Sequence, residues 1–475
     1  MREEGEKGET PLEREGCGYD AKSCIAARGI PMTDCSPDLT LFPLSQKPVV
    51  VRADGGALTS DAGALLLRQL DERLGLTRRL AGCVVDRRES SKVRHDVLSL
   101  LRQRIYQIAL GYEDCNDADH LRADPALKLA VGRAPTEDEL ASQPTLSRLE
   151  NAVGWRECWR FSEALLECYL QRHHKCPPRR IVLDVDATDD ETHGDQQLAF
   201  FHGYYDEHCY LPLLVFAQAE GTGEQELIAA MLRPGNVHGG HQAMALIGAV
   251  VRRLRAALPE CVIELRADSA LALPEVYEGC EKIALPYTIS LPKNERLMEM
   301  AEPWMTDAQA IHAETGEKVQ VFGAFAYAAH TWSRERRVIC KAEVMSQGEN
   351  PRFVVTSRGD VEPEAHYRFY CQRGDPENRI KELKLDLKAD RLSCHRFWAN
   401  QFRLLLHAAA YVLMQAMRKL LAGTEFARAQ VATLRLFLLK VGARIRESVR
   451  RVFVQLPSAY PWFELWHRLA RAGPG

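Results

Sequence analysis

Ile181-Val-Leu-Asp-Val-Asp186 is the stretch from which the fold can be predicted, because it is an apolar run that ends in an acid. Side chains alternate between the two faces of a strand, so Asp184 and Asp186 share one face and the aliphatic side chains share the other. A second apolar run, residues 261–268, has the same alternation and ends in Asp268. Ligands of open α/β sheets bind at the carboxyl ends of the strands. We therefore expect Asp186 and Asp268 to lie together at one edge of a sheet. Taken alone, each aspartate also fits a helix cap or a solvated loop.

The segments around these two runs predict an α/β fold. Helical periodicity extends from about residue 58 to residue 170, and strand and helix patterns then alternate up to residue 291. Alternating strands and helices are typical of a sheet covered by helices. Residues 293–366 contain short strand patterns with turn residues between them, which predicts a β-rich insertion. Helical periodicity returns at Asp375.

The net charge of −3 conceals an uneven distribution of charge along the chain. Residues 1–20 hold seven acids and three bases, whereas the region from Arg391 onward holds 14 Lys or Arg and three acids. Residues 78–104 are also basic, with eight bases and three acids. Basic regions favour a polyanion partner, because neutralising phosphates releases condensed counterions. A solvated helix surface explains the same charges equally well.

Cysteine spacing and hydropathy predict a cytoplasmic protein. None of the 14 cysteines forms a Cys-x-x-Cys pair, which favours reduced, packed thiols over a zinc site or a disulfide framework. The N-terminus lacks the apolar segment of a secretion signal. The longest uncharged apolar run, residues 404–417, is too short to span a bilayer.

A third acid stands in a distinctive spacing. Two residues separate Tyr370 from Arg373, three separate Arg373 from Glu377, and six separate Glu377 from Lys384. Glu377 and Lys384 are seven apart, so they share one face of a helix. A surface helix with paired charges, such as Glu377 with Lys381, explains the charges but not the whole spacing.

Two residues inside that spacing predict where the helix begins. Asp375 is suited to the N-cap and Pro376 to the first helical position. Glu377 then lies in the first turn, where the helix dipole stabilises a carboxylate.

The spacing resembles the Tyr-Arg-Glu-Lys signature of one branch of the DDE transposases of bacterial insertion sequences. The family's first catalytic aspartate ends the first strand in an Asp-X-Thr/Ser context, which Asp186-Ala-Thr188 matches. Its second ends the fourth strand, which Asp268 matches, and Glu377 is the third acid. Asp184 and Asp189 remain rivals for the first position. Asp184 lies deeper in the strand, and Asp189 lies past its end.

The resemblance implies an α/β fold with a ribonuclease H-like mixed sheet flanked by helices, interrupted by a β-rich insertion and preceded by a helical N-terminal domain. The expected parts are a disordered tail (1–47), a helical N-terminal DNA-binding region (48–175), the first part of the catalytic core (176–292), the β-rich insertion (293–366), the second part of the core with the Glu-bearing helix (367–421), and a basic helical C-terminal region (422–475).

The resemblance also implies roles for the site residues. Asp186, Asp268 and Glu377 would be catalytic and would bind two Mg²⁺ ions, for which Mn²⁺ would substitute. Tyr370, Arg373 and Lys384 would hold DNA phosphates. A further candidate for DNA binding is Trp332, beside several arginines, which would stack on an unpaired base. A core or strand-surface position for this tryptophan is also open.

The expected activity is cleavage of insertion-sequence ends and strand transfer into target DNA. The expected partners are both DNAs and a second copy of the chain, as a homodimer on paired ends. The alternatives are a ribonuclease H-like nuclease without strand transfer and a DNA-binding transposase derivative without activity.

Overall fold

The computed structural model describes residues 38–471 and divides the chain into two compact units, residues 1–56 and 57–475. In the first unit β1 (Leu39–Leu44) and β2 (Lys47–Val51) form an antiparallel hairpin. The expected disordered tail lies outside the described residues as far as residue 37. From Leu39 onward the expectation is wrong, because a β-prone run and a turn at Ser45 form a hairpin.

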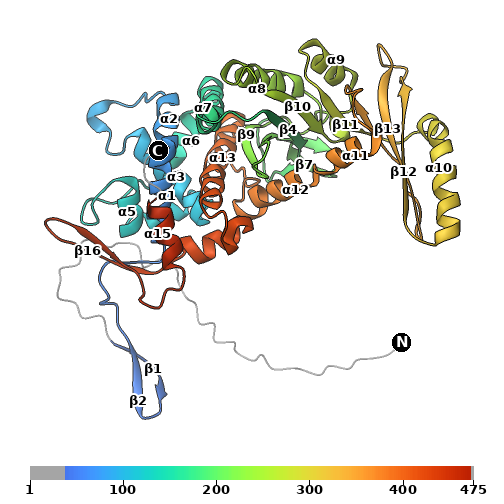
Figure 1. Ribbon diagram of the computed structural model, residues 1–475. Coiled ribbons are helices and arrows are strands. Elements are labelled where there is room, and N and C mark those ends of the chain that lie inside the picture. Colours follow the sequence, from blue (N-terminus) through green and yellow to red (C-terminus); the bar gives the residue numbers. More distant parts are fainter. Residues whose placement is uncertain (1–37, 472–475) are drawn as a thin grey trace, which may run out of the picture. The chain divides into compact units, whose positions relative to one another are not determined.

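The second unit is built around one large mixed sheet (Figure 1). Its strand order is β12-β13-β15-β11-β10-β4-β8-β9, with β14 paired to β13. Strands β4, β10 and β11 are mutually parallel, and the remaining pairs are antiparallel. The strands are β4 (Arg180–Ala187), β8 (Leu213–Ala219), β9 (Gln225–Met231), β10 (Val262–Ala267), β11 (Tyr287–Leu291), β12 (Val319–Tyr327), β13 (Arg336–Met345), β14 (Gly348–Glu349) and β15 (Arg352–Thr356). A small sheet lies between β4 and β8 in the chain: β5 (Asp190–Glu191), β6 (Phe200–His202) and β7 (Glu207–Tyr210).

The two faces of the large sheet differ in polarity. Ile181, Leu183 and Val185 of β4 join one apolar core with α8 (Ala243–Ala257), α9 (Pro274–Lys282) and α10 (Glu295–Thr315). The opposite face of β4 presents Asp184 and Asp186, as the alternation predicted. This face is covered by α11 (Pro363–Cys371) and α12 (Gly374–Lys381), and a π-helical turn (Glu382–Asp386) continues α12.

Residues 293–366 contain strands at the three places where the sequence predicted them, but they also contain a long helix that was not predicted. They begin with α10, which is 21 residues long and contains Pro303 inside the helix, and that proline obscured the helical pattern. The strands that follow extend the large sheet, because β15 pairs antiparallel with β11. The sheet therefore continues through a segment that the sequence suggested was a separate part.

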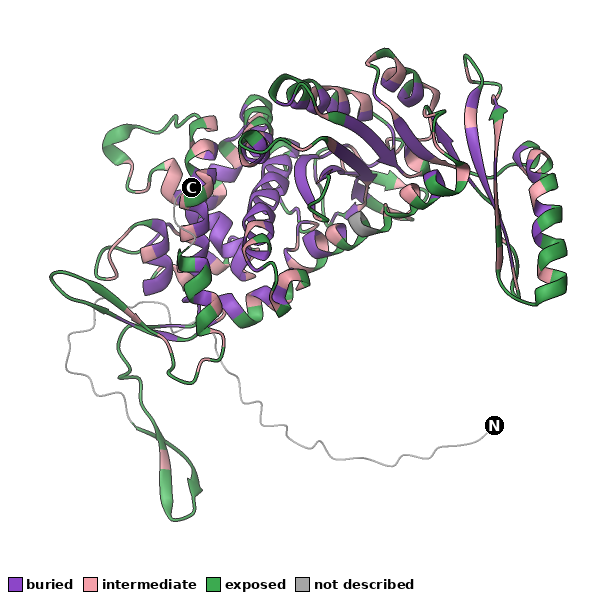
Figure 2. Cartoon of the chain, in the orientation of Figure 1, coloured by how far each residue is buried: buried purple, intermediate pink, exposed green. Residues whose placement is uncertain are grey.

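The helical N-terminal region packs on the sheet both directly, through its last helix, and through one long helix that follows the sheet in the chain. Its helices are α1 (Ala64–Leu74), α2 (Leu76–Cys83), α3 (Val97–Leu110), α4 (Asp117–Leu121), α5 (Pro125–Val131), α6 (Gln143–Ala152) and α7 (Trp155–His174). The long helix α13 (Phe397–Leu420) is buried almost all around (Figure 2). Phe402 meets Phe161 of α7 edge to face at 5.3 Å on one side of α13. On another side, Gln401 and Gln415 hydrogen-bond the backbone of the edge strand β9 and its neighbour Leu232.

The C-terminal region is only partly helical. A 3-10 turn (Glu425–Arg428), α14 (Val431–Leu434), a π-helical turn (Arg435–Leu439) and α15 (Phe463–Arg471) flank the strands β16 (Ala443–Glu447) and β17 (Val452–Gln455). These strands pair as β17-β16-β3 with β3 (Leu58–Thr59), so strands replace part of the expected helical region. The alternation of this segment fits a strand, in which Ala443 and Ile445 are buried and Arg444 and Arg446 are exposed.

The cysteines and the apolar helices are the features on which two further expectations depended. Every cysteine in residues 38–471 is a free thiol. Among the helices of the described chain, none has the length and apolar character needed to cross a bilayer.

One buried ion pair lies within the helical region. Arg104 of α3 donates to Glu150 of α6 at 2.8 Å, and both side chains are almost fully buried. Arg104 also donates to the backbone carbonyls of Tyr112 and Glu113.

We predict that Glu150→Ala lowers the free energy of unfolding by about 3–5 kcal/mol, because it leaves two buried charges unpaired, Arg104 and Arg403, which lies 3.9 Å from the same carboxylate. Urea denaturation of the full chain measures the change. The double variant Arg104→Met/Glu150→Leu also removes the Arg104 charge, so that of Arg403 alone loses its partner, and it should be less destabilised. Equal losses for the two variants would contradict this explanation.

Candidate active site

Two of the three acids singled out by the sequence lie at the carboxyl ends of adjacent parallel strands. Asp186 is the residue before the last one of β4 and is 7% exposed. Asp268 follows β10 directly, and its carboxylate accepts a hydrogen bond from the backbone N–H of Ala270 at 3.0 Å. Because β4 and β10 pair with Asp184 opposite Arg266, the two strands bring both aspartates to the same edge.

The third acid, Glu377, lies on α12. This helix begins at Gly374 with Arg373 as its N-cap, so the expected N-cap at Asp375 and first helical position at Pro376 are each inside the first turn instead. The side chains of Asp375 and Pro376 lie outside the described residues. The Glu377 side chain is 55% exposed.

The guanidinium of Arg373 joins the three acids. One nitrogen, Nη2, lies 2.9 Å from Asp186 Oδ2 and 3.8 Å from Asp268 Oδ2. The other, Nη1, lies 3.3 Å from Glu377 Oε1. The family resemblance implied that Arg373 binds DNA phosphates. In the structure, which contains no DNA, its guanidinium contacts the three carboxylates.

Burial sets the protonation of this cluster. Burial raises the pKa of Asp186 to about 7, although Arg373 acts in the opposite direction, and the charges of Asp268 and Glu377 add to the rise. Burial also raises the pKa of Asp268. Carboxylates with raised pKa values are incompletely neutralised by one arginine, and a stronger positive charge would stabilise their ionised forms.

The donor set fits a divalent cation in its chemistry. Asp186, Asp268 and Glu377 offer the carboxylate oxygens that Mg²⁺ and Mn²⁺ prefer. Within residues 38–471, however, no three acid, histidine or cysteine side chains lie close enough together to hold one ion. The Arg373 guanidinium accounts for this separation, because it lies between the three carboxylates.

Lys384 and Tyr370 lie on either side of this cluster. Lys384, in the π-helical turn, contacts Asp189 Oδ2 at 3.2 Å and Thr188 Oγ1 at 3.3 Å. Lys384 also lines a cavity of about 340 Å³ together with Asp186 and Glu377. Tyr370, at the end of α11, packs beside Tyr367, and burial raises the pKa of its hydroxyl.

The two rivals for the first carboxylate have other partners. Asp189 pairs with Lys384, and Asp184 forms a fully buried ion pair with Arg266. Of the three aspartates considered for the first position, Asp186 is therefore the one that contacts Arg373, together with Asp268 and Glu377. The sequence analysis did not predict the ion pair between Lys384 and Asp189, because no spacing in the sequence links the two residues.

Trp332 lies apart from these residues. Its ring meets those of Tyr277 and Tyr327 edge to face, and the Arg336 guanidinium lies 5.3 Å from its centroid. This cluster packs on the apolar core on the opposite face of the sheet from Asp186. The placement favours the core position that the sequence left open for Trp332.

We predict that Arg373→Gln raises the affinity of the DNA-free protein for Mn²⁺ by at least about tenfold. Each unit of positive charge on an ion about 4 Å from the guanidinium costs roughly 4 kcal/mol at the effective dielectric of a protein surface. The signal of free Mn²⁺ in electron paramagnetic resonance measures the affinity. Arg368→Gln on α11 is the matched control, because within residues 38–471 Arg368 pairs only with the exposed Glu364. Equal affinities for the two variants would rule out competition between Arg373 and the cation.

Comparison with known proteins gives the family. A family model described as transposase DDE domain group 1 matches residues 42–472. A search of curated proteins found no match. Among solved structures, the Mos1 transposase paired-end complex with left transposon end matches at 15% identity, with a TM-score of 0.16, over 45% of this chain. The match spans 63% of the length of that Mos1 chain. Because the family model matches most of the sequence, the chain belongs to the transposase DDE domain group 1 family.

Proposed function

We propose that this protein is a metal-dependent transposase that cleaves DNA at the ends of an insertion sequence and joins those ends to target DNA. The observation that carries the proposal is the convergence of Asp186, Asp268 and Glu377, from two strands and a helix, on one guanidinium. Acids from three separate elements meeting at one point fit a site for phosphoryl transfer better than a surface charge pair.

The proposed chemistry assigns each residue a task. Asp186, Asp268 and Glu377 would hold two Mg²⁺ ions, or Mn²⁺ ions, which supply an activated oxygen nucleophile and neutralise charge at the phosphorus. Arg373 and Lys384 would bind phosphates of the DNA strand beside the carboxylates, and the planar guanidinium can do so with two hydrogen bonds. Tyr370 would complete the Tyr-Arg-Glu-Lys set.

The order of the strands supports a ribonuclease H-like core. In chain order the first four strands of the large sheet are β4, β8, β9 and β10. Asp186 therefore lies at the end of the first strand and Asp268 follows the fourth, as the resemblance to DDE transposases implied. We propose that this core acts in a homodimer that holds two transposon ends together.

We further propose that the helical N-terminal region binds the DNA outside the cleavage site. Its surface contains a cleft of about 1190 Å³ lined by seven arginines and lysines and four acids. Arg94 and Arg148 in this cleft are exposed and make no ion pair with an acid of the described chain. Burial lowers the pKa of His95 in the cleft, and the charges of Arg133, Arg88 and Arg94 lower it further. A site that crowds cations in this way attracts an anion such as DNA.

We predict that Glu377→Gln lowers the rate of Mg²⁺-supported cleavage of transposon-end DNA by more than about 100-fold, since even the partners of metal ligands contribute 10–100-fold. Binding of the same DNA should be retained. Cleavage is followed on labelled end DNA, with Glu364→Gln on α11 as the control. Undiminished cleavage by Glu377→Gln would remove the assignment of the third acid.

Strand transfer separates the proposal from the nuclease alternative. Precut ends carrying a 3′-hydroxyl are incubated with a plasmid target and Mg²⁺. Joined products support the transposase, hydrolysis without joining supports a nuclease, and DNA binding without either reaction supports an inactive derivative.

We predict that Arg94→Gln/Arg148→Gln weakens DNA binding and lowers the slope of log affinity against log salt by about 2, roughly one for each phosphate that the variant no longer neutralises. Fluorescence anisotropy of labelled duplex at several salt concentrations measures both quantities. Arg252→Gln/Lys282→Gln removes the same charge from exposed positions on α8 and α9 and should change neither. Equal effects of the two double variants would mean that net charge alone determines binding.

A further inference from the structure

The polar face of the sheet carries a second pair of charges directly behind the carboxylates. Asp184 and Arg266 lie two residues before Asp186 and Asp268, on the same face, and are opposite one another in the register of β4 and β10. Arg266 Nε lies 2.6 Å from Asp184 Oδ1, and Nη2 lies 2.8 Å from Oδ2. The Arg266 side chain is 0% exposed and the Asp184 side chain is 1% exposed, so this pair does not contact solvent.

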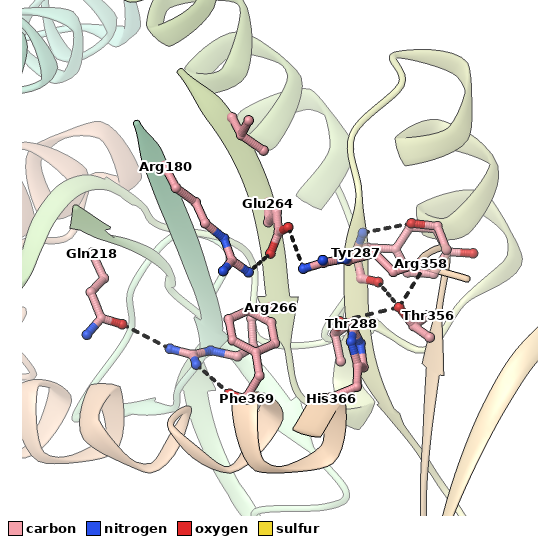
Figure 3. A network of polar contacts seen from close by, with 12 residues as sticks. Arg180, Gln218, Glu264, Arg266, Tyr287, Thr288, Thr356, Arg358, His366 and Phe369 are labelled. Carbon is pink, nitrogen blue, oxygen red and sulfur yellow. Dashed lines mark hydrogen bonds and ion pairs between the residues drawn. The ribbon is translucent and has the colours of Figure 1, made fainter. Parts of the chain in front are cut away.

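The remaining donor of Arg266 reaches the helix above the sheet. Its Nη1 donates to the backbone carbonyl of Phe369 at 2.7 Å, and Figure 3 shows this contact together with the one to Gln218. Phe369 is in the last turn of α11, and its carbonyl also accepts a long hydrogen bond from the backbone N–H of Gln372 at 3.3 Å. Arg266 therefore holds the C-terminal end of α11 against β10.

The Phe369 side chain is held in the same place. The guanidinium carbons of Arg180 and Arg266 lie 4.8 Å and 5.0 Å from the centroid of its ring. Arg180 is fixed in turn by Glu264, which also accepts a hydrogen bond from Arg358 at 2.9 Å (Figure 3). Farther along α11, His366 Nε2 lies 2.8 Å from Thr288 Oγ1 of β11.

The apolar contact between α11 and the sheet is small. Tyr367 of α11 packs with two buried side chains of the sheet, Ile339 and Val354, and Phe322, Ala324 and Tyr370 are partly buried against them. Directional polar contacts specify a single placement, whereas a small apolar contact permits sliding.

The end of α11 determines where the third acid lies. Tyr370 follows Phe369, and α12 begins at Gly374 after a short turn that contains Arg373. A shift of Phe369 would therefore shift Arg373 and Glu377 relative to Asp186 and Asp268. Catalytic geometry is sensitive to such shifts, because a displacement of about 1 Å can cost about 100-fold in rate.

We propose that Arg266, held by Asp184, is a positioning residue for the reaction: it fixes the end of α11 and thereby places Glu377 opposite the two strand-borne aspartates. The inference rests on the proposed function of these three acids. Buried ion pairs contribute little net stability compared with apolar side chains of similar volume, so a role in placement accounts for the pair better than a role in stability.

The test replaces the pair by apolar side chains in the full-length chain, as Asp184→Leu/Arg266→Met. Thermal stability and affinity for end DNA should stay near those of the unchanged protein. Cleavage of bound DNA should fall by about 100-fold. Affinity for Mn²⁺, read from the resonance of the free ion, should fall by about tenfold, as for loss of a group that orients metal ligands.

The matched control is Arg104→Met/Glu150→Leu. Arg104 also pairs with a buried glutamate and donates to backbone carbonyls, but it lies in the helical N-terminal region. This control should keep both the Mn²⁺ affinity and the rate of cleavage of bound DNA.

Arg266→Lys covers the possibility that the apolar variant does not fold. Lysine retains the charge opposite Asp184, but its single ammonium cannot supply the planar fork that also reaches Phe369. A folded Arg266→Lys protein should bind end DNA normally, with reduced cleavage and weaker Mn²⁺ binding. Cleavage and Mn²⁺ binding equal to those of the control would overturn the inference. If the unchanged protein does not cleave DNA, the proposed function fails, and the Mn²⁺ measurement still decides whether Arg266 places the acids.

Discussion

A charge buried in a protein must be paired, because burial without a partner costs several kcal/mol, and this constraint governs the polar face of the sheet. Asp184 accepts hydrogen bonds from Nε and Nη2 of Arg266. The charge of Asp186 must therefore be neutralised by another residue. Arg373 supplies the positive charge from the turn between α11 and α12. The ion pair between Arg373 and Asp186 thus holds the helix that bears Glu377 near the strand ends. The same negative charge makes these strand ends suitable for a cation.

The far end of α12 is fixed by a second buried charge. Glu382, in the π-helical turn, accepts hydrogen bonds from Tyr411 and Arg418 of α13, each at 2.6 Å. π-Helical turns often occur at functional sites, and this one also carries Lys384 toward Asp189. The segment from Phe369 to Glu382 is therefore held at both ends by buried ion pairs, while Glu377 between them is exposed.

Local patterns in the sequence predicted those parts of the fold that depend on neighbouring residues. The alternation of apolar and charged residues before Asp186 and Asp268 predicted which side chains share a face of the sheet, and in the structure they share the same faces. The N-terminal boundary of α12 was wrong by two residues, since the turn closes around Arg373 through its long-range contacts. The pairing of β15 with β11 and the Lys384–Asp189 contact join residues far apart in the chain, and no periodicity encodes such pairs. The strands within residues 293–366 were predicted, whereas α10 in the same segment was missed, because Pro303 interrupts its helical pattern.

The nearly complete burial of α13 bears on the order in which the protein is made. This helix is synthesised late, yet it lies against α7 of the N-terminal region and supplies Gln401 and Gln415 to the edge of β9. At ribosomal speeds of about 5–20 residues per second, the earlier helices and the open strand edge wait for roughly tens of seconds before α13 emerges. Unpaired strand edges and uncovered apolar faces promote aggregation during such a delay. In the nascent chain, the edge of β9 and the apolar face of α7 that contacts α13 therefore stay uncovered until α13 has been translated.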